Sequence, residues 1–270
     1  MSQPLVLDSV THLKPEHRGL AAYCASHGGA YSGYYAPKMG IGAVILNDAG
    51  IGREQAGIVG LRLLNALGVP AAAIAHTSAR IGDGADGHAN GRLSFVNAAA
   101  RRLDLDVGMS CATALHRLAR APLTPSPPPQ PLDEVRFDIP SAGNTGIRVF
   151  GIDSNALVTS ADIGHIAITG SHGGLLGNKP ETAIKVDVRA AVYNDAGFGR
   201  DNAGISRLPA LDARGIAGAC VSCFSARIGD ARSTYDDGFI SALNDTARRY
   251  GGAIGQSCKE FVAAMVKSVG

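Results

Sequence analysis

The chain has 270 residues, of which 46% are hydrophobic, and its formal net charge of +2 comes from 25 basic and 23 acidic residues. These charges are intermixed along the chain, which is not the pattern of a nucleic-acid or membrane-surface protein. No apolar run approaches the roughly 18 residues of a membrane span, and the first residues do not resemble a signal peptide. We therefore expect a cytoplasmic protein with no nucleic-acid and no membrane partner.

The five cysteines are an odd number in a chain without a recognisable export signal, which favours reduced thiols over a disulfide framework. Cys220 and Cys223 have CxxC spacing, but they lie in a strand-like run, where residues three apart face opposite sides. No second pair completes a zinc site. Cys24 is expected to be a small buried residue.

The chain contains two similar halves. Residues 47–53 (NDAGIGR) return as 194–200 (NDAGFGR), and residues 78–83 (SARIGD) return unchanged as 225–230. Both pairs have one offset, 194 − 47 = 225 − 78 = 147. This period is far longer than the roughly 20 to 50 residues of a solenoid unit, so it indicates a duplicated domain.

Short apolar runs in the first half end in polar or glycine-rich turns, and longer segments of helical pattern follow them. They predict strands that alternate with helices, at residues 5–7, 20–24, 42–46 and 71–75. After the third run, helical spacing and a stop at Gly68 predict a helix, and the pattern recurs before Gly215, where Pro209 weakens it. Strands that are buried on both faces and alternate with helices pair in parallel.

Residues 121–140 contain seven prolines, which exclude a helix or an inner strand and indicate an extended linker. We therefore predict an α/β protein that is a tandem duplication of an α/β domain, with a mostly parallel sheet and halves related by a pseudo-twofold axis. The predicted boundaries are a first repeat at 1–120, a Pro-rich linker at 121–146 and a second repeat at 147–270.

In such sheets a ligand binds beyond the carboxyl ends of the strands, and the repeated polar motifs fall at those ends. The first is Asp8 with Ser9, matched by Asp153 with Ser154. The second is SHGG, at an offset of 171 − 26 = 145. Its hydroxyl, imidazole and free glycine amides suit acyl or proton transfer, whereas a tight turn with glycines at positive φ is the structural alternative. Its residues are Ser26, His27, Gly28 and Gly29, and Ser171, His172, Gly173 and Gly174.

The NDAG motif supplies the next candidates, with Asn47, Asp48 and Arg53 in the first half. An aspartate at a helix start is also a common N-cap. Because the glycine spacing is not GxGxxG, we expect no nicotinamide cofactor. The cofactor prediction is none, with a divalent metal left open. The matching residues of the second half are Asn194, Asp195 and Arg200.

The SARIGD motif offers an arginine fork suited to carboxylate or phosphate, together with an aspartate that orients the fork or takes a proton. An internal Arg and Asp pair that holds the loop is the alternative. The predicted site residues are Ser78, Arg80 and Asp83, and Ser225, Arg227 and Asp230.

Cys111 and Cys258 follow serines where a helical segment begins. A thiol at a helix N-terminus can have a lowered pKa and act as a nucleophile, although burial in the core is its ordinary fate. His76 of the first half is matched by Cys223. Such differences predict one composite site, or one active and one degenerate site. Lys38 and its match Lys185 are expected to be surface charges.

We therefore expect a hydrolase of a small carboxylated or cyclic amide. Arg80 and Arg227 would hold a carboxylate, while histidines and aspartates, His76 among them, would move protons. A serine or cysteine would attack, and the Gly-Gly amides would stabilise the oxyanion. The expected partners are the small-molecule substrate and further copies of the chain in a homo-oligomer.

Three alternatives remain open. A cofactor-independent racemase or isomerase would use one Cys, one His and one Asp from each half around the pseudo-twofold axis. A metal-dependent lyase or hydrolase would bind magnesium, manganese or zinc through Asp8, His27, Asp48 and Asp83. A small-molecule binding protein would need only the arginines and backbone amides.

Overall fold

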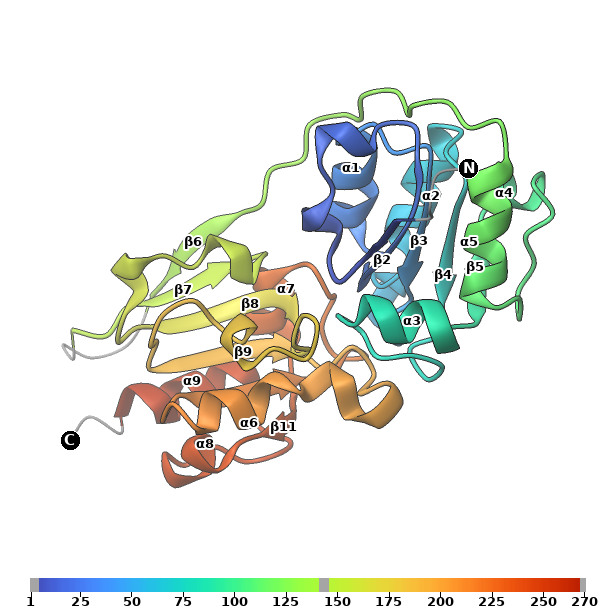
Figure 1. The fold of residues 1–270 in the computed structure, drawn as a ribbon. Coiled ribbons are helices and arrows are strands. Elements are labelled where there is room, and N and C mark those ends of the chain that lie inside the picture. Colours follow the sequence, from blue (N-terminus) through green and yellow to red (C-terminus); the bar gives the residue numbers. More distant parts are fainter. Residues whose placement is uncertain (1–4, 141–145, 268–270) are drawn as a thin grey trace.

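The computed structural model of the protein describes residues 5–140 and 146–267 and contains two open sheets (Figure 1). In the first sheet the strands lie side by side in chain order. The first four are parallel, and the fifth pairs antiparallel with the fourth. The strands are β1 (Leu5–Leu7), β2 (Ala21–His27), β3 (Ala43–Asn47), β4 (Ala71–Ile74) and β5 (Leu93–Val96).

The second sheet repeats this order and adds one strand. Strands β7 to β10 are parallel neighbours, β11 pairs antiparallel with β10, and β6 pairs antiparallel with β7 at the opposite edge. The predicted α/β class with mostly parallel sheets is therefore confirmed. The strands are β6 (Arg136–Ile139), β7 (Val149–Ile152), β8 (Ile166–His172), β9 (Ala190–Asn194), β10 (Ala217–Val221) and β11 (Ile240–Leu243).

Helices cover both faces of each sheet. In β2, Ala22 and Cys24 pack in the apolar cluster that includes residues of α1 and α2, whereas Tyr23 and Ala25 pack in the cluster that includes α5. This two-sided burial explains why the strands read as continuous apolar runs. The helices are α1 (Ala30–Lys38), α2 (Val59–Ala66), α3 (Gly84–Asn90), α4 (Ala98–Arg101), α5 (Cys111–Arg120), α6 (Arg207–Asp212), α7 (Ala231–Asp237), α8 (Asp245–Arg249) and α9 (Cys258–Lys267). The 3-10 helices are Val10–His12, Pro15–His17, Arg53–Gln55, Asn155–Leu157, Ser160–Asp162, Pro180–Thr182 and Arg200–Ile205.

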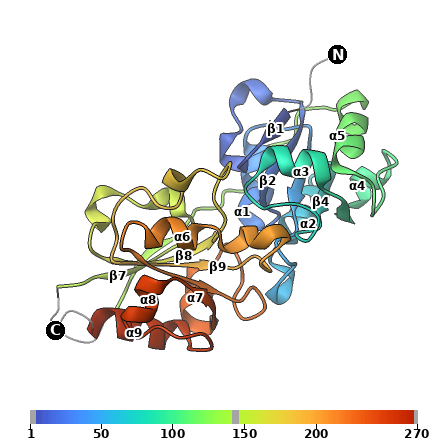
Figure 2. The same cartoon turned by 60° about the horizontal axis from the view of Figure 1, so that its bottom comes forward.

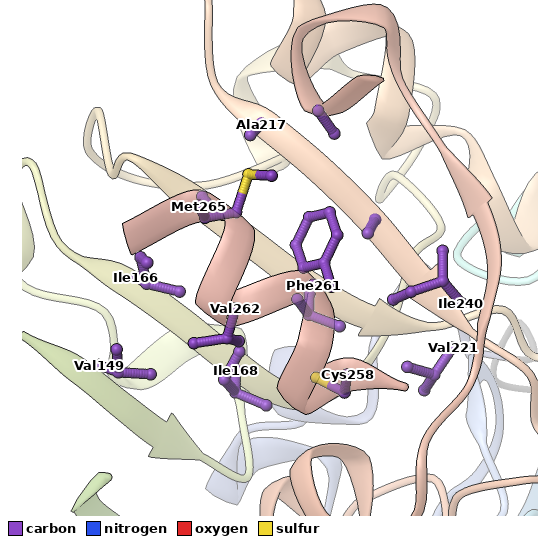
Figure 3. Packing of buried hydrophobic residues seen from close by; sticks show 14 of the residues in the cluster. Val149, Ile166, Ile168, Ala217, Val221, Ile240, Cys258, Phe261, Val262 and Met265 are labelled. Atoms are coloured by element: carbon purple, nitrogen blue, oxygen red, sulfur yellow. The ribbon is translucent and has the colours of Figure 1, made fainter. Parts of the chain in front are cut away.

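Helix α9 forms the core of the second half on one face of its sheet. Phe261 and Met265 are fully buried, and Figure 3 shows them with Val262 against side chains of the strands, among them Ile166 and Ile168. The helices predicted before Gly68 and Gly215 are α2 and α6. Helix α6 is the shorter of the two and contains Pro209.

The proline-rich segment runs along the first half before it enters the second. Ser126 Oγ donates to the Pro37 carbonyl at 3.1 Å, and its amide donates to the Ile41 carbonyl at 3.3 Å. Residues 136–139, inside the range predicted as linker, form the edge strand β6. An edge position is compatible with the exclusion of an inner strand, whereas residues 141–145 of the predicted linker lie outside the described ranges. In those ranges, no helix has the length and hydropathy needed to cross a membrane.

Candidate functional site

A cavity of about 250 Å³ lies between the two halves, at the carboxyl ends of β2 and β8. Residues from both halves line it, and Figure 2 shows these halves from a second direction. The Asp-Ser and SHGG motifs line the cavity in part, through Ser9, Asp153, Ser154, Ser26, His27, Ser171 and His172. The composite arrangement predicted from the sequence is therefore present for these motifs.

His27 and His172 end their strands and meet across the boundary between the halves. Their ring centroids lie 6.4 Å apart, with an angle of 79° between the ring planes. In both, Nδ1 accepts a hydrogen bond from the amide two residues later, at 3.2 Å from Gly29 N and 3.1 Å from Gly174 N. An Nδ1 that accepts this bond carries no proton, so in the neutral ring the proton is on Nε2. Among the described residues neither Nε2 has a hydrogen-bond partner, which leaves two N–H donors for the cavity.

Close packing requires a glycine at the second glycine position of each SHGG motif. A Cβ on Gly29 would come within 2.6 Å of His27 Nδ1, and a Cβ on Gly174 within 2.9 Å of His172 Nδ1. Neither residue has a positive φ, so the tight-turn explanation of the glycines is wrong.

The glycine amides do not form the expected oxyanion site. The amides of Gly28 and Gly173 donate to the carbonyls of Asn47 and Asn194, both at 2.8 Å. The second glycine of each pair donates to its histidine, as described above. All four amides are therefore used within their own halves.

Burial lowers the pKa of His27 to about 4. The pKa of His172 lies well below its usual range, because the ring is buried and because Arg207 and His27 oppose its positive charge. Both imidazoles are therefore neutral near pH 7. A neutral imidazole with Nδ1 occupied acts as a hydrogen-bond donor through Nε2.

The two SHGG serines line the cavity and hold neighbouring loops through their hydroxyl groups. Ser26 Oγ accepts from Val10 N at 2.9 Å, and Ser171 Oγ accepts from Asn155 N at 2.9 Å. No hydrogen bond joins either hydroxyl to a histidine within the described residues. The structure therefore does not pair the serine expected to attack with a histidine that could take its proton.

Three charged residues of the cavity, Arg207, Glu134 and Glu181, were missed because they are not repeated between the halves. Lys185, which was expected to be a surface charge, is exposed and also lines the cavity. Arg207 begins α6 at the position that corresponds to Gly60 (207 − 147 = 60). Glu134 comes from the linker and lines the cavity beside Tyr31. Burial and the Asp153 carboxylate raise the pKa of Glu134, although hydrogen bonds from Tyr31 and Ser154 oppose the shift.

The aspartates of the NDAG motifs lie outside the cavity. Asp48 Oδ1 accepts from the amides of Gly50 at 3.1 Å and His76 at 2.9 Å, and it lies 2.8 Å from His76 Nδ1. Asp195 Oδ1 accepts in the same way from the amides of Gly197 and Cys223, both at 2.9 Å. These carboxylates connect the loops after neighbouring strands. Asp48 and Asp195 do not cap a helix, so the N-cap interpretation is wrong. Asp48, Asp195 and His76 also do not line the cavity.

Asn47 and Asn194 form local turns instead of contacting the cavity. Their Oδ1 atoms accept from the amides two residues later, at 2.8 Å from Ala49 and 3.0 Å from Ala196. Such a side chain replaces a backbone turn contact.

The four repeated arginines join the halves. Arg53 Nη1 donates to the Ser225 carbonyl at 2.7 Å, and Arg200 Nη1 donates to the Ser78 carbonyl at 3.1 Å. The other two arginines, Arg80 and Arg227, form ion pairs with acidic side chains of the opposite half. Arg80 Nη2 lies 2.6 Å from Asp201 Oδ2. Arg227 Nη1 lies 3.2 Å from Glu54 Oε1. None of the four lines the cavity, so the structure does not bring Arg80 and Arg227 to it as the carboxylate clamp requires.

The polar residues around these arginines also have structural contacts. Ser78 Oγ and Ser225 Oγ accept from the amides of Arg92 and Phe239, both at 3.0 Å. Asp83 caps α3 and Asp230 caps α7 through Oδ1, at 2.9 Å from Asp86 N and 2.8 Å from Ser233 N. Asp230 also pairs with Arg227 at 2.9 Å, as the structural alternative for this motif predicted.

Cys111 and Cys258 are fully buried in separate hydrophobic clusters of the two halves. Figure 3 shows Cys258 among the apolar side chains of its core. Burial raises the pKa of Cys111 to about 12 and also raises that of Cys258. The structure therefore places both thiols in cores and not at one site, whereas the racemase alternative would need the two thiols at the same site. All five thiols are free, and Cys24 is buried as expected.

The four ligands proposed for a metal do not converge. Asp8 Oδ1 accepts from Gly84 N at 2.8 Å, while Asp48 is bonded to His76. Within residues 5–140 and 146–267, no group of three or more His, Cys, Asp or Glu side chains is arranged to hold an ion.

None of the protein-family models, curated proteins or solved structures compared with this chain matches it. A function for this chain therefore has to be inferred from the geometry of its cavity.

Proposed function

We propose that the protein is a hydrolase of a small carboxylated or cyclic amide, whose carbonyl oxygen accepts hydrogen bonds from Nε2 of His27 and of His172. The observation that carries this proposal is the pair of neutral imidazoles that line one cavity with Nδ1 occupied, which leaves Nε2 of each ring as a donor. Two donors fixed in a partly buried site stabilise negative charge as it develops on a carbonyl oxygen. They take the role that the glycine amides cannot fill.

In this mechanism Glu134 is the proton carrier. It lines the same cavity, and its raised pKa moves the carboxyl toward the range in which it exchanges protons near neutral pH. As a carboxylate it would take a proton from the attacking water, and as an acid it would return that proton to the leaving nitrogen. No covalent intermediate is required, in agreement with the structural roles of Ser26, Ser171, Cys111 and Cys258.

A second candidate is an isomerase that removes a proton next to a carbonyl group. A carboxylate base together with a neutral imidazole donor is an established combination for that chemistry. The ring separation of 6.4 Å lies in the range of directly paired aromatic rings. A substrate carbon does not fit between rings this close, which argues against bases on opposite faces of one carbon, as in a racemase.

The test compares His27→Gln with His27→Ala, and the same pair at His172, on a panel of small carboxylated and cyclic amides. Glutamine keeps an N–H donor, whereas alanine removes it. We expect kcat to fall by about 10²- to 10³-fold in the alanine variants and by less in the glutamine variants. Equal losses in both would contradict the donor role.

The same assays in deuterated water separate the two candidates. An isomerase incorporates a solvent deuteron at carbon, whereas a hydrolase opens or cleaves the amide without such exchange. Amide cleavage without carbon-bound deuterium in the product supports the hydrolase. Exchange without cleavage supports the isomerase.

We also infer that the two halves arose by duplication and are related by a pseudo-twofold axis. The constant sequence offset supports this inference, as does the shared order of four parallel strands followed by an antiparallel strand. So do the reciprocal contacts across the boundary, such as Arg53 N to the Cys223 carbonyl and Arg200 N to the His76 carbonyl, both at 2.8 Å. Superposition of the halves in a crystal structure tests the axis directly.

A further inference from the structure

Arg207 is a buried cation beside the paired histidines. Its side chain is 3% exposed. Nε donates to the His172 carbonyl at 3.3 Å, and Nη1 donates to the carbonyls of Thr182 and Ala183. The guanidinium also lies over the Tyr193 ring, 5.2 Å from its centroid. Among the described residues Nη2 has no hydrogen-bond partner, and Arg207 lines the cavity.

No carboxylate in the described part of the chain balances this charge. Glu134, Asp153 and Glu181 also line the cavity, but none of them lies within the 4.0 Å that defines an ion pair with Arg207. Asp153 accepts hydrogen bonds from the amides of Ala231 and Val135, and Glu181 is exposed. Arginine remains protonated even when buried. Carbonyl oxygens and an aromatic face compensate only part of the cost of burying a full charge.

The first half has no equivalent cation. Gly60 stands at the corresponding position, and a Cβ there would lie 2.2 Å from the Gly29 carbonyl oxygen. No side chain fits at that position. The cavity therefore has one buried guanidinium, on the side of His172, and this asymmetry would orient a ligand.

We propose that Nη2 of Arg207 binds the carboxylate of the substrate. This inference rests on the proposed function for its location and specifies which end of the substrate each half binds. A buried guanidinium without an ion-pair partner matches an anionic group, and its edge fits a planar carboxylate. Lys185 also lines the cavity, but it is exposed and donates to the Ala156 carbonyl. With the carboxylate on Arg207, the susceptible carbonyl would lie toward the two imidazoles.

The test measures binding of butyrate, with uncharged butyramide as its control, by NMR at constant ionic strength. In the wild-type protein we expect butyrate to bind at least tenfold more tightly than butyramide and to shift the side-chain signals of Arg207. In Arg207→Gln we expect the preference for butyrate to disappear. Arg207→Lys keeps the charge but loses the fork, so it should bind butyrate more weakly than the wild type.

Arg62→Lys is the matched control, because Arg62 lies exposed on α2, the helix that corresponds to α6. It should bind butyrate like the wild type. Equal affinity of the wild-type protein for butyrate and butyramide would overturn the inference, and this comparison does not depend on whether a variant folds. A butyrate preference retained in folded Arg207→Gln would overturn it as well.

The butyrate test and the proposed hydrolase function can fail independently of each other. His27→Ala should lose turnover and still bind butyrate. If butyrate binds at Arg207 but no amide on the panel is cleaved, the hydrolase proposal fails and the anion site stands. If amides are cleaved but the affinity for butyrate does not depend on Arg207, the anion-site inference fails and the hydrolase proposal stands.

Discussion

Gly50 and Gly197 pack directly against each other where the two halves meet. A Cβ on either glycine would come within 3.0 Å of the other's Cα, and both have a positive φ, of 76° and 72°. The contact brings the second NDAG loop against His76 and the first against Cys223. The repeated glycines therefore serve the approach of one half to the other, and this approach places His27 beside His172.

Gly50→Ala should destabilise the protein by about 2 to 4 kcal/mol. Roughly 1 to 2 kcal/mol comes from the left-handed backbone and the rest from overpacking at the contact. Gly68→Ala is the control, because Gly68 has a φ of 74° but nothing within 4 Å of an added Cβ. Equal losses for both variants in denaturant unfolding would show that the contact between the halves is unimportant for stability.

The pKa of His27 predicts a specific pH dependence of stability. Because the folded-state value of about 4 lies below the unfolded value of about 6.5, the unfolded state binds more protons between these two pH values. This residue therefore lowers the free energy of unfolding as the pH falls from about 6.5 to about 4, and has no further effect outside that window.

The measurement compares wild type with His27→Gln, since the contributions of other groups cancel in the difference. The stability of the wild type relative to the variant should fall as the pH is lowered through the window. A difference that stays constant from pH 7 to pH 4 would contradict the lowered pKa.

Gly29→Ala should impair catalysis through His27. The added Cβ would come within 2.6 Å of the imidazole, and Gly29 has a φ of −71°, which alanine adopts without strain. We expect a destabilisation of about 1 to 3 kcal/mol from overpacking and a loss of turnover close to that of His27→Ala. Ala30→Ser, at the exposed neighbouring position, is the control. Full activity in Gly29→Ala would show that the position of the ring is not important.

Cys111→Ala and Cys258→Ala should retain kcat within a factor of about two and lose roughly 0.5 to 3 kcal/mol of stability. Both thiols are buried in cores, and their pKa values are raised. A thiol reagent should therefore label them only after unfolding. Loss of turnover in a folded cysteine variant would restore the nucleophilic mechanism.

Secondary structure and topology class were largely predictable from the sequence. The apolar runs at 5–7 and 71–75 became β1 and β4, and the pattern before Gly68 became α2. Local hydrophobic patterns determine such elements because burial on both sides of a strand needs a continuous apolar run. The strand β6 was missed, because a single edge strand beside a proline-rich segment has no distinctive pattern.

The repeated motifs lie at the edge of the sheets where the cavity is found, but they do not tell which side chains line it. His27 and His172 line it, whereas Asp48, Arg80 and Cys111 have contacts between loops, between halves or in the core. Repetition preserves every contact that the two halves share, structural as well as functional. It therefore cannot rank the residues within a motif.

The sequence by itself determined the two α/β halves, the extended connection and the positions of the polar loops, since these follow from hydrophobic period, proline content and the repeat. Only the tertiary structure decided that Arg207 and Glu134 belong to the cavity. Both are unique to one place in the chain, and their role arises when the halves meet and bury them beside the paired imidazoles. Side-chain direction and loss of solvent depend on that packing, which local sequence does not specify.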